Sequence, residues 1–470
     1  MRVMDFFIAA KANMVFRRRL IFRKERRTME NDLFEKMPVP KAYMKLAFPV
    51  VLSMMVSLVY NMVDTYFIAL TGVKELVAGV SLVVPVFTMM IAFGDIFGIG
   101  GSSAISRLFG EKKDEEAKHA SAFCIWASIG FSLCVSLILL VLKRQILGIL
   151  GADETTYEHA EAYYTWIAIG AAAVIFGLVP SNILRTEGLA AQSMIGSIIG
   201  SIANIILDPI FIFGLHQGAA GAAIATVLGN LLADLYYVYA ITKRSKRLSA
   251  SFSKIRISGK MAAGIFMIGI PASITNLMQS FMVMMTNHFL LPYGMDKVAA
   301  MGIALKANMI TALILVGFAF GGQPLVGYNF GSGNRKRLRE ILKFAYLFEM
   351  GLGLLFTVAM SVFAPMIIGI FMSDPDIVGS GAMMLRCQQA GMTFMAVTLV
   401  STCVCQSVGD ALGAFVLSVS RQGVLYAVAL VILSRVLGYQ GVLISQACAD
   451  VVTAVLAVII IRNIMKKHQM

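Results

Sequence analysis

The sequence predicts an all-α polytopic membrane protein, and three observations lead to this fold class. First, 58% of the 470 residues are hydrophobic, only 14% are charged, and the mean hydropathy is +0.80. Soluble chains carry about 25% charged residues, so this chain lacks the polar side chains that a soluble surface of its length needs. Second, the apolar residues form twelve long runs. Third, the second half of the chain repeats landmarks of the first.

The twelve apolar runs are the expected membrane-spanning helices, since a helix needs about 20 residues to cross the hydrocarbon core. Proline and glycine within them are compatible with helices in lipid, because neighbouring helices satisfy the freed backbone groups. The runs lie at 42–70, 77–106, 118–142, 160–184, 191–214, 218–242, 260–290, 298–328, 340–371, 381–407, 412–434 and 441–465.

Landmarks recur along the chain at nearly one offset. Pro49 of the first half is matched by Pro271 of the second, and Gly188 is matched by Gly409. Each copy contains six spans, an even number, so both copies enter and leave the membrane on the same side. The sequence therefore predicts two six-helix lobes related by a pseudo-twofold axis along the membrane normal. Such lobes favour alternating access, and a duplicated channel or scaffold is the alternative.

The expected organisation follows from this repeat. We expect a first lobe at 41–242, a Ser-rich basic linker at 243–260, and a second lobe at 261–465. A basic N-terminal segment at 1–40 precedes the first lobe, with Met29 as an alternative start that would make 1–28 an extension. A short tail occupies 466–470. The basic N-terminal residues suit the surface of anionic membrane lipids.

Lysine and arginine are distributed unequally between the two ends of the expected helices. Segments on one side hold 32 of them and segments on the other hold six, with Lys306 and Arg421 inside spans. Cytoplasmic loops carry the excess of positive charge, so we expect the cytoplasmic (inner) cell membrane and two cytoplasmic termini. The same distribution accounts for the net charge of +14 without a nucleic-acid partner.

Ionisable side chains inside the spans are functional candidates, because each costs about 2.5–3.5 kcal/mol on insertion. Asp64 follows Pro49 at the spacing at which Thr286 follows Pro271, so the second lobe has a threonine in its place. The charge of Asp64 is not repeated in the second lobe, so its role belongs to the first lobe alone. Asp64 either binds a proton or cation or takes part in a structural ion pair. The ionisable residues within spans are Asp64, Asp95, Asp208, Asp234, Lys306, Glu349, Arg421 and Asp450.

Asn204, Asp208 and Pro209 form a second polar group in the fifth span. Residues four apart share one helix face, and a proline frees a carbonyl one turn back. Hard cations bind several oxygen ligands, and Thr226 in the sixth span would add a hydroxyl. This pattern predicts an ion-coupling site, with Na⁺ as a possible metal at Asp64, Asn204, Asp208 and Thr226. The alternative is a helix kink at which Asp208 bonds locally.

Other functions are disfavoured by what the sequence contains. No GxxxxGK[ST] phosphate loop is present, so ATP is not expected to power the chain. The five histidines are scattered, which argues against a membrane-embedded enzyme, and no cofactor is expected beyond a coupling ion. Further polar residues within spans are the candidate lining of a substrate cavity: Asn61, Lys306, Glu349 and Asp450.

These residues resemble the multidrug and toxic compound extrusion (MATE) family of bacterial type. The resemblance rests on Pro49 with Asp64, on Gly100-Gly101 with Phe109-Gly110, on Asn204 with Asp208-Pro209, and on the stretch from Gly221 to Thr226. It implies twelve helices in two lobes and export of organic cations and other amphipathic drugs, driven by sodium ions or protons. It also implies that the first-lobe ion site comprises Asp64, Asn204, Asp208 and Thr226.

The leading hypothesis is therefore a monomeric secondary antiporter that exports amphipathic or cationic drugs from the cytoplasm in exchange for H⁺ or Na⁺. A flippase for lipid-linked saccharides of the same superfamily is the alternative. It would favour a strongly cationic central cavity, whereas the acids within the spans outnumber the bases six to two. A membrane-embedded enzyme is a more distant alternative.

Overall fold

The computed structural model describes residues 32–371 and 374–468, and these residues form helices and connecting loops. The first half contains α2 (Val39–Leu70), α3 (Lys74–Gly110), α4 (Asp114–Val141), α5 (Lys143–Ile149), α6 (Tyr157–Ile169), α7 (Ala171–Thr186), α8 (Ala190–Pro209) and α9 (Gly218–Tyr239). Two π-helical segments, η1 (Ile210–Gly214) and η2 (Ala240–Arg244), continue α8 and α9. The expected segment 1–28 and Met29 lie outside the described residues.

The second half repeats this order. It contains α10 (Gly259–Leu290), α11 (Met295–Gly331), α12 (Arg335–Val362), α13 (Ala364–Phe371), α14 (Pro375–Ala390), α15 (Met392–Val408), α16 (Ala411–Val419), α17 (Leu425–Leu437) and α18 (Tyr439–Lys467). The π-helical η5 (Ser420–Val424) joins α16 to α17, and short 3₁₀ turns, η3 (Phe252–Lys254) and η4 (Leu291–Tyr293), flank α10.

Helix lengths and breaks confirm the predicted repeat. Both α3 and α11 have 37 residues, and both α4 and α12 have 28. The fourth span bends by 48° at Gly170, between α6 and α7, and the tenth bends by 42° at Gly391, between α14 and α15. Gly170 and Gly391 are separated by the same offset as Gly188 and Gly409, so the duplication extends to the irregularities of the helices.

The predicted number of spans is confirmed, although several spans are not single regular helices with the predicted ends. Ten described helices are long and apolar enough to cross a membrane, and the two bent pairs bring the total to twelve. The ninth span does not run to 371, because α12 ends at Val362 and the next residues form the separate α13. The eleventh span is not one regular helix, because the π-helical segment η5, which begins at Ser420, interrupts its α-helical hydrogen-bond pattern.

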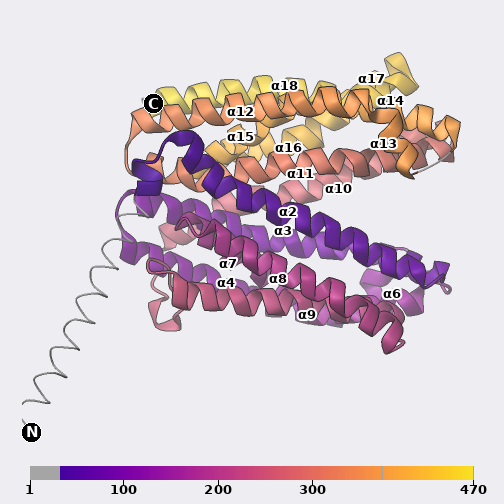
Figure 1. Cartoon of the computed structure of the whole chain (residues 1–470), viewed down its shortest axis with the longest axis horizontal. Coiled ribbons are helices and arrows are strands. Elements are labelled where there is room, and N and C mark those ends of the chain that lie inside the picture. Colours follow the sequence, from indigo (N-terminus) through magenta and orange to yellow (C-terminus); the bar gives the residue numbers. More distant parts are fainter. Residues whose placement is uncertain (1–31, 372–373, 469–470) are drawn as a thin grey trace, which may run out of the picture.

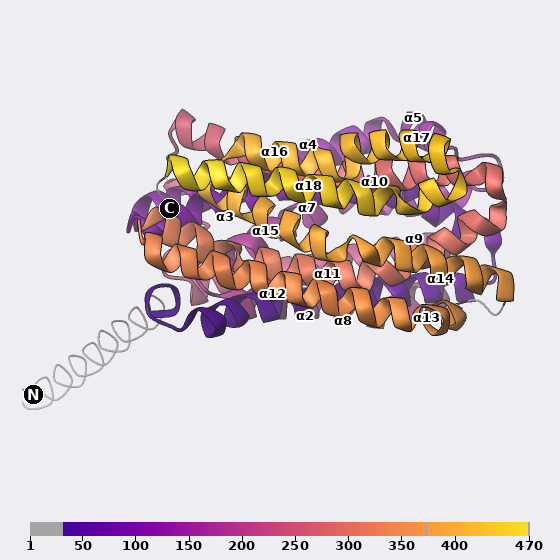
Figure 2. The ribbon, with the colours of Figure 1, turned by 90° about the horizontal axis from the view of Figure 1, so that it is seen from above.

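The two halves form two helical bundles that lie side by side. In Figure 1 the first bundle, in indigo to magenta, lies below the orange and yellow second bundle, and Figure 2 shows the same helices from above. The bundles converge at the end that carries the C-terminus and diverge towards the opposite end (Figure 1). We call the convergent end, where α3 ends at Gly110 and α11 ends at Gly331, the linker end.

Two symmetry-related glycines allow the lobes to meet at the linker end. A Cβ atom on Gly110 would lie 2.1 Å from the carbonyl oxygen of Tyr328, and one on Gly331 would lie 2.2 Å from that of Arg107. Arg107 and Tyr328 are equivalent residues of the two copies, as are the two glycines, so each contact is the copy of the other. The backbones of α3 and α11 approach this closely only because both positions lack a side chain.

Arg107 joins the two lobes at the same end. Its guanidinium donates to the carbonyl oxygen of Ser407 at 2.9 Å and to the hydroxyl of Ser103 at 2.7 Å. Ser407 lies in the last turn of α15, which ends at the left-handed Gly409 with φ of +84°. An arginine from the first lobe therefore satisfies a carbonyl that the second-lobe helix leaves free at its C-terminus.

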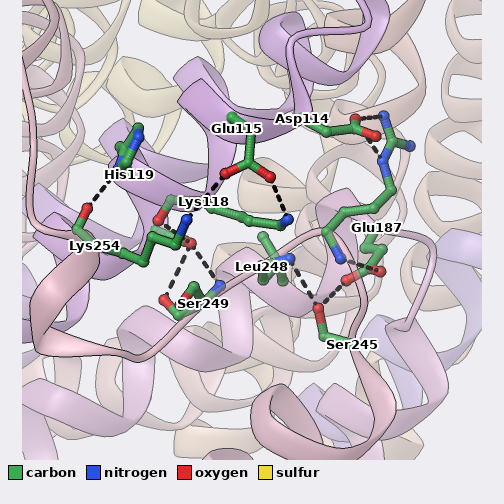
Figure 3. Close-up of polar contacts among 11 residues, drawn as sticks. Asp114, Glu115, Lys118, His119, Glu187, Ser245, Leu248, Ser249 and Lys254 are labelled. Carbon is green, nitrogen blue, oxygen red and sulfur yellow. Dashed lines mark hydrogen bonds and ion pairs between the residues drawn. The ribbon is translucent and has the colours of Figure 1, made fainter.

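The connection between the lobes is bound to the first lobe (Figure 3). Glu187, at the end of α7, accepts hydrogen bonds from the backbone amides of Lys246 and Arg247 at 2.9 and 3.1 Å. His119 of α4 contacts the carbonyl oxygen of Lys254 at 2.6 Å. The chain is thus held to the first lobe as far as Lys254, a few residues before α10 begins in the second lobe.

We expect Gly110→Ala to destabilise the protein by about 1–3 kcal/mol, because the added methyl group must push α3 and α11 apart. Thermal unfolding of the purified protein in detergent measures this change. Gly130→Ala in α4 is the matched control, because a Cβ atom there would have no other group within 4 Å. Alanine at that position should be neutral or stabilising, since alanine favours helix more than glycine does. Equal melting of the two variants would contradict the close approach.

Candidate ion and substrate site

Three helices of the first lobe bring the predicted ion-coupling residues together. Asn204 and Asp208 lie one turn apart on the buried face of α8, as their spacing predicts, and Thr226 faces them from α9. The amide of Asn204 donates to Asp208 Oδ1 and to Thr226 Oγ1, both at 3.3 Å. Asn204, Asp208 and Thr226 are all buried. Asn204 is therefore the centre of this polar group.

Asp64 completes the group from α2. Its carboxyl group interacts electrostatically with that of Asp208, and both carboxyl groups interact with Tyr60 and Tyr163. Two adjacent carboxyl groups in a poorly solvated site repel each other strongly when both are ionised. One shared proton or a bound cation relieves this repulsion.

Several oxygen atoms of this group have no partner. Asp64 Oδ1, Asn204 Oδ1 and Asp208 Oδ2 are buried and accept no hydrogen bond from the described residues, 32–371 and 374–468. Buried polar atoms without partners are rare and costly. Carboxylate, amide and hydroxyl oxygens are the ligands that hard cations prefer, so this donor set fits a sodium ion as well as a proton.

The helix geometry after Pro209 differs from a simple kink. The α-helical pattern ends at Pro209, and the wider π-helical segment η1 follows at once. Proline cannot donate to the preceding turn, so the chain resumes with a longer hydrogen-bond spacing. Asp208 also bonds locally to Asn204, as the alternative interpretation expected, but Asp64 and Thr226 reach this group from other helices.

A cavity of about 270 Å³ lies in the first lobe beside this group. Asn204 and Thr226 belong both to this polar group and to the cavity wall, so the two share side chains. Asn61, a predicted cavity residue, also lines it. The remaining wall consists of Ser57, Tyr60, Phe87, Ile91, Val174, Gly177, Leu178, Ser181, Ser197, Gly200, Ser201, Asn230, Ala233, Asp234 and Tyr237.

The other three predicted cavity residues lie elsewhere, in the second lobe. Lys306 lies on α11 outside the first-lobe cavity, and Glu349 is fully buried in α12. Asp450 of α18 is buried and forms an ion pair with Arg421 of η5, with 2.8 Å between Oδ1 and Nε. The structure thus brings Asn61 to the first-lobe cavity and does not bring the other three residues to it.

Sequence reasoning missed Tyr60 and Tyr163, and it named Asp234 among the ionisable residues within spans without placing it at the cavity. Tyr60 precedes Asp64 by four residues, a spacing that places it on the same face of α2. Asp234 follows Thr226 by eight residues, about two turns of α9, and the same periodicity would have placed it at the cavity. Tyr163 comes from a different helix, α6, and no local pattern points to it.

We expect Arg421→Met to destabilise the protein by about 3–5 kcal/mol, because it leaves the carboxylate of Asp450 buried and unpaired. The double variant Arg421→Met, Asp450→Leu removes both charges and should recover most of this loss. Thermal unfolding in detergent measures both effects. If the single and double variants melt alike, the ion pair does not hold α18 to η5.

Comparisons with known proteins agree with this architecture. The MatE family model matches residues 49–210 and 271–432, one segment in each lobe. The multidrug export protein MepA of Staphylococcus aureus is 31% identical over 431 residues, which cover 91% of this chain and 94% of MepA.

Two solved structures are similar over nearly the whole chain. A MATE protein in complex with MaD3S is 26% identical, with a TM-score of 0.88, covering 93% of this chain and 98% of that one. The outward-facing conformation of a multidrug resistance MATE family transporter of the MOP superfamily is 25% identical, with the same TM-score and coverage.

Proposed function

This chain belongs to the MatE family, and on that premise we propose that it is a secondary antiporter that exports amphipathic, cationic compounds in exchange for H⁺ or Na⁺. One observation carries the proposal. Three buried oxygen atoms without partners among the described residues, on Asp64, Asn204 and Asp208, lie in a group that shares Asn204 and Thr226 with the wall of a cavity. An ion bound at the first group therefore changes the surroundings of a molecule bound in the cavity.

The distribution of positive charge supports an orientation for this antiporter. The linker end carries the basic segments that begin at Lys112, Lys243 and Arg335, so it would face the cytoplasm. Both termini then lie on the cytoplasmic side of the cell membrane. In this arrangement the lobes are closed towards the cytoplasm, through Gly110, Gly331 and Arg107, and diverge on the opposite side (Figure 1).

The coupling follows from the differential stability of two states. A doubly ionised Asp64–Asp208 pair is unfavourable in a poorly solvated site, whereas a proton or sodium ion relieves the repulsion. Ion binding therefore favours conformations that bury the pair. If α2 and α8 repack when the ion enters, the cavity that they line releases its substrate. The energy comes from the ion gradient, and the chain acts as a monomer without ATP.

The cavity wall supports a cationic, amphipathic substrate. Phe87, Ile91, Val174 and Leu178 offer apolar contacts, and Asp234 offers a carboxyl group whose Oδ1 has no partner among the described residues. The wall contains no Lys, Arg or His within the described part of the chain. A flippase for lipid-linked saccharides would need positive charge to hold a pyrophosphate, so this cavity favours the antiporter.

We expect Asp64→Asn to lose gradient-driven export, by about 5- to 150-fold for a coupling free energy of about 1–3 kcal/mol. The variant keeps the shape of the side chain and removes its charge, which imitates a permanently neutralised site. Dye efflux from vesicles with an imposed proton or sodium gradient measures the effect, and Asp208→Asn should also weaken coupling.

Thr286→Ser is the matched control for Asp64→Asn, because Thr286 occupies the equivalent position in the second lobe and bonds to the Tyr426 hydroxyl at 2.5 Å. Serine keeps that hydroxyl, so export should continue. Wild-type efflux by Asp64→Asn under both gradients would place the coupling site elsewhere in the protein.

We expect a disulfide between Ser106→Cys and Gly327→Cys to stop export reversibly, because it fastens α3 to α11 at the linker end. A Cβ on Gly327 would lie 2.9 Å from that of Ser106, so the helices need to part by only about 1 Å to reach disulfide geometry. Efflux before and after reduction measures the effect. Undiminished export by the oxidised protein would contradict alternating access at this end.

A further inference from the structure

Glu349 is a fully buried acid that the proposed antiport does not use. It lies on the buried face of α12, in a stripe otherwise made of Leu338, Ile341, Leu342, Ala345 and Gly353. Both of its carboxyl oxygens are buried and have no hydrogen-bond partner among residues 32–371 and 374–468. The side chain is 0% exposed. A carboxylate in such surroundings would be strongly destabilised, so burial favours the neutral, protonated form of the group.

The titratable neighbours of Glu349 are few. Among the described residues, those that interact with it electrostatically are Tyr43 of α2 and Cys403 of α15. Tyr346 and Arg185 approach Cys403 from other helices. Within the described part of the chain, none of these residues forms an ion pair with the Glu349 carboxyl group. The described residues also do not surround this carboxyl group with oxygen ligands for a metal cation. A proton is therefore the ion that fits.

Tyr43 of the first lobe packs against the helix that carries this acid. Its ring packs against Phe344 and Phe348 of α12, with centroids 5.4 and 6.3 Å away, and its hydroxyl donates to the carbonyl oxygen of Phe318 of α11 at 2.9 Å. A Cβ on Gly322 would lie 2.3 Å from the Tyr43 ring. The first-lobe tyrosine thus packs between α11 and α12 of the second lobe, close enough to Glu349 to interact with it electrostatically.

The fold itself does not require an acid at this position. The equivalent residue of the first lobe, at the offset that relates Gly188 to Gly409, is Ser128, which is also 0% exposed. Its hydroxyl donates to the carbonyl oxygen of Ile125 at 2.8 Å. A small residue with a local hydrogen bond therefore satisfies the same packing in the other copy, and Glu349 adds only an ionisable group.

We propose that Glu349 is a second proton-binding site, which holds its proton while the linker end is closed and releases it when the lobes separate there. Parting α2 from α11 and α12 withdraws Tyr43 and admits water to the carboxyl group. Hydration then stabilises the carboxylate, and the proton leaves to the solvent at the linker end. Closing the lobes again buries the group and requires that it regain a proton.

This inference rests on the proposed alternating access but not on the first-lobe ion site, so the two can be tested apart. The background for the test is the cysteine-free double variant Asp64→Asn, Asp208→Asn, in which the first-lobe carboxyl pair is absent. Spin labels at Glu116→Cys and Lys336→Cys, exposed positions at the linker end of each lobe, report the distance between the lobes in lipid nanodiscs.

The fraction of molecules open at the linker end is measured from about pH 5 to pH 9. Because the closed form retains one more proton than the open form, the open-to-closed ratio should rise with pH, by up to about tenfold per unit where a single proton is released. Adding Glu349→Gln should make the ratio independent of pH and favour the closed form. Glu349→Leu should do the same and suits the apolar stripe if glutamine folds poorly.

Ser128→Ala is the matched control, since it changes the equivalent buried position without removing an ionisable group, and it should leave the pH dependence intact. A pH dependence that persists with both Glu349→Gln and Glu349→Leu would overturn the proposal. So would a ratio that is already independent of pH in the background variant. Loss of export by Asp64→Asn bears only on the first-lobe site.

Discussion

The close approach of α3 and α11 at the linker end is the contact on which the rest of the structure depends. Gly110 and Gly331 let each helix lie against the backbone of the other, and the two contacts are exchanged by the internal pseudo-symmetry. The two lobes contact each other at this end, and the linker is bound to the first lobe through Glu187. The bundles therefore diverge only towards the opposite end.

The duplication is close for the backbone and incomplete for the charges. Helix lengths, bends and glycine contacts recur at nearly one offset, whereas Asp64 is matched by Thr286 and Glu349 by Ser128. Packing constrains backbone positions in both copies, since a side chain at Gly110 or at Gly331 would collide with the backbone of the facing helix. No packing requirement selects a carboxyl group within lipid, so acids that are present in one copy alone point to function.

The first lobe concentrates its polar groups where three helices meet. Asn204 contacts both Asp208 and Thr226, and it also lines the cavity, so a change in this polar group reaches the cavity wall through one side chain. In the second lobe the buried Asp450 is neutralised by Arg421. A paired acid of this kind supports packing, whereas Asp64, Asp208 and Glu349 each have at least one buried carboxyl oxygen without a hydrogen-bond partner among the described residues.

The sequence alone determined the fold class and the number of spans, because hydropathy is a local property that the membrane enforces strongly. It also determined the repeat, because matching landmarks recur along the chain at nearly one offset. It also identified Asp64, Asn204, Asp208 and Thr226 as a group, since i, i+4 spacing and the family resemblance both point to them. Only the tertiary structure placed Tyr163 beside Asp64 and Asp234 at the cavity, and separated Lys306, Glu349 and Asp450 from it. The physical reason is that helix orientation and lobe packing decide which distant faces meet, and no short stretch of sequence records that choice.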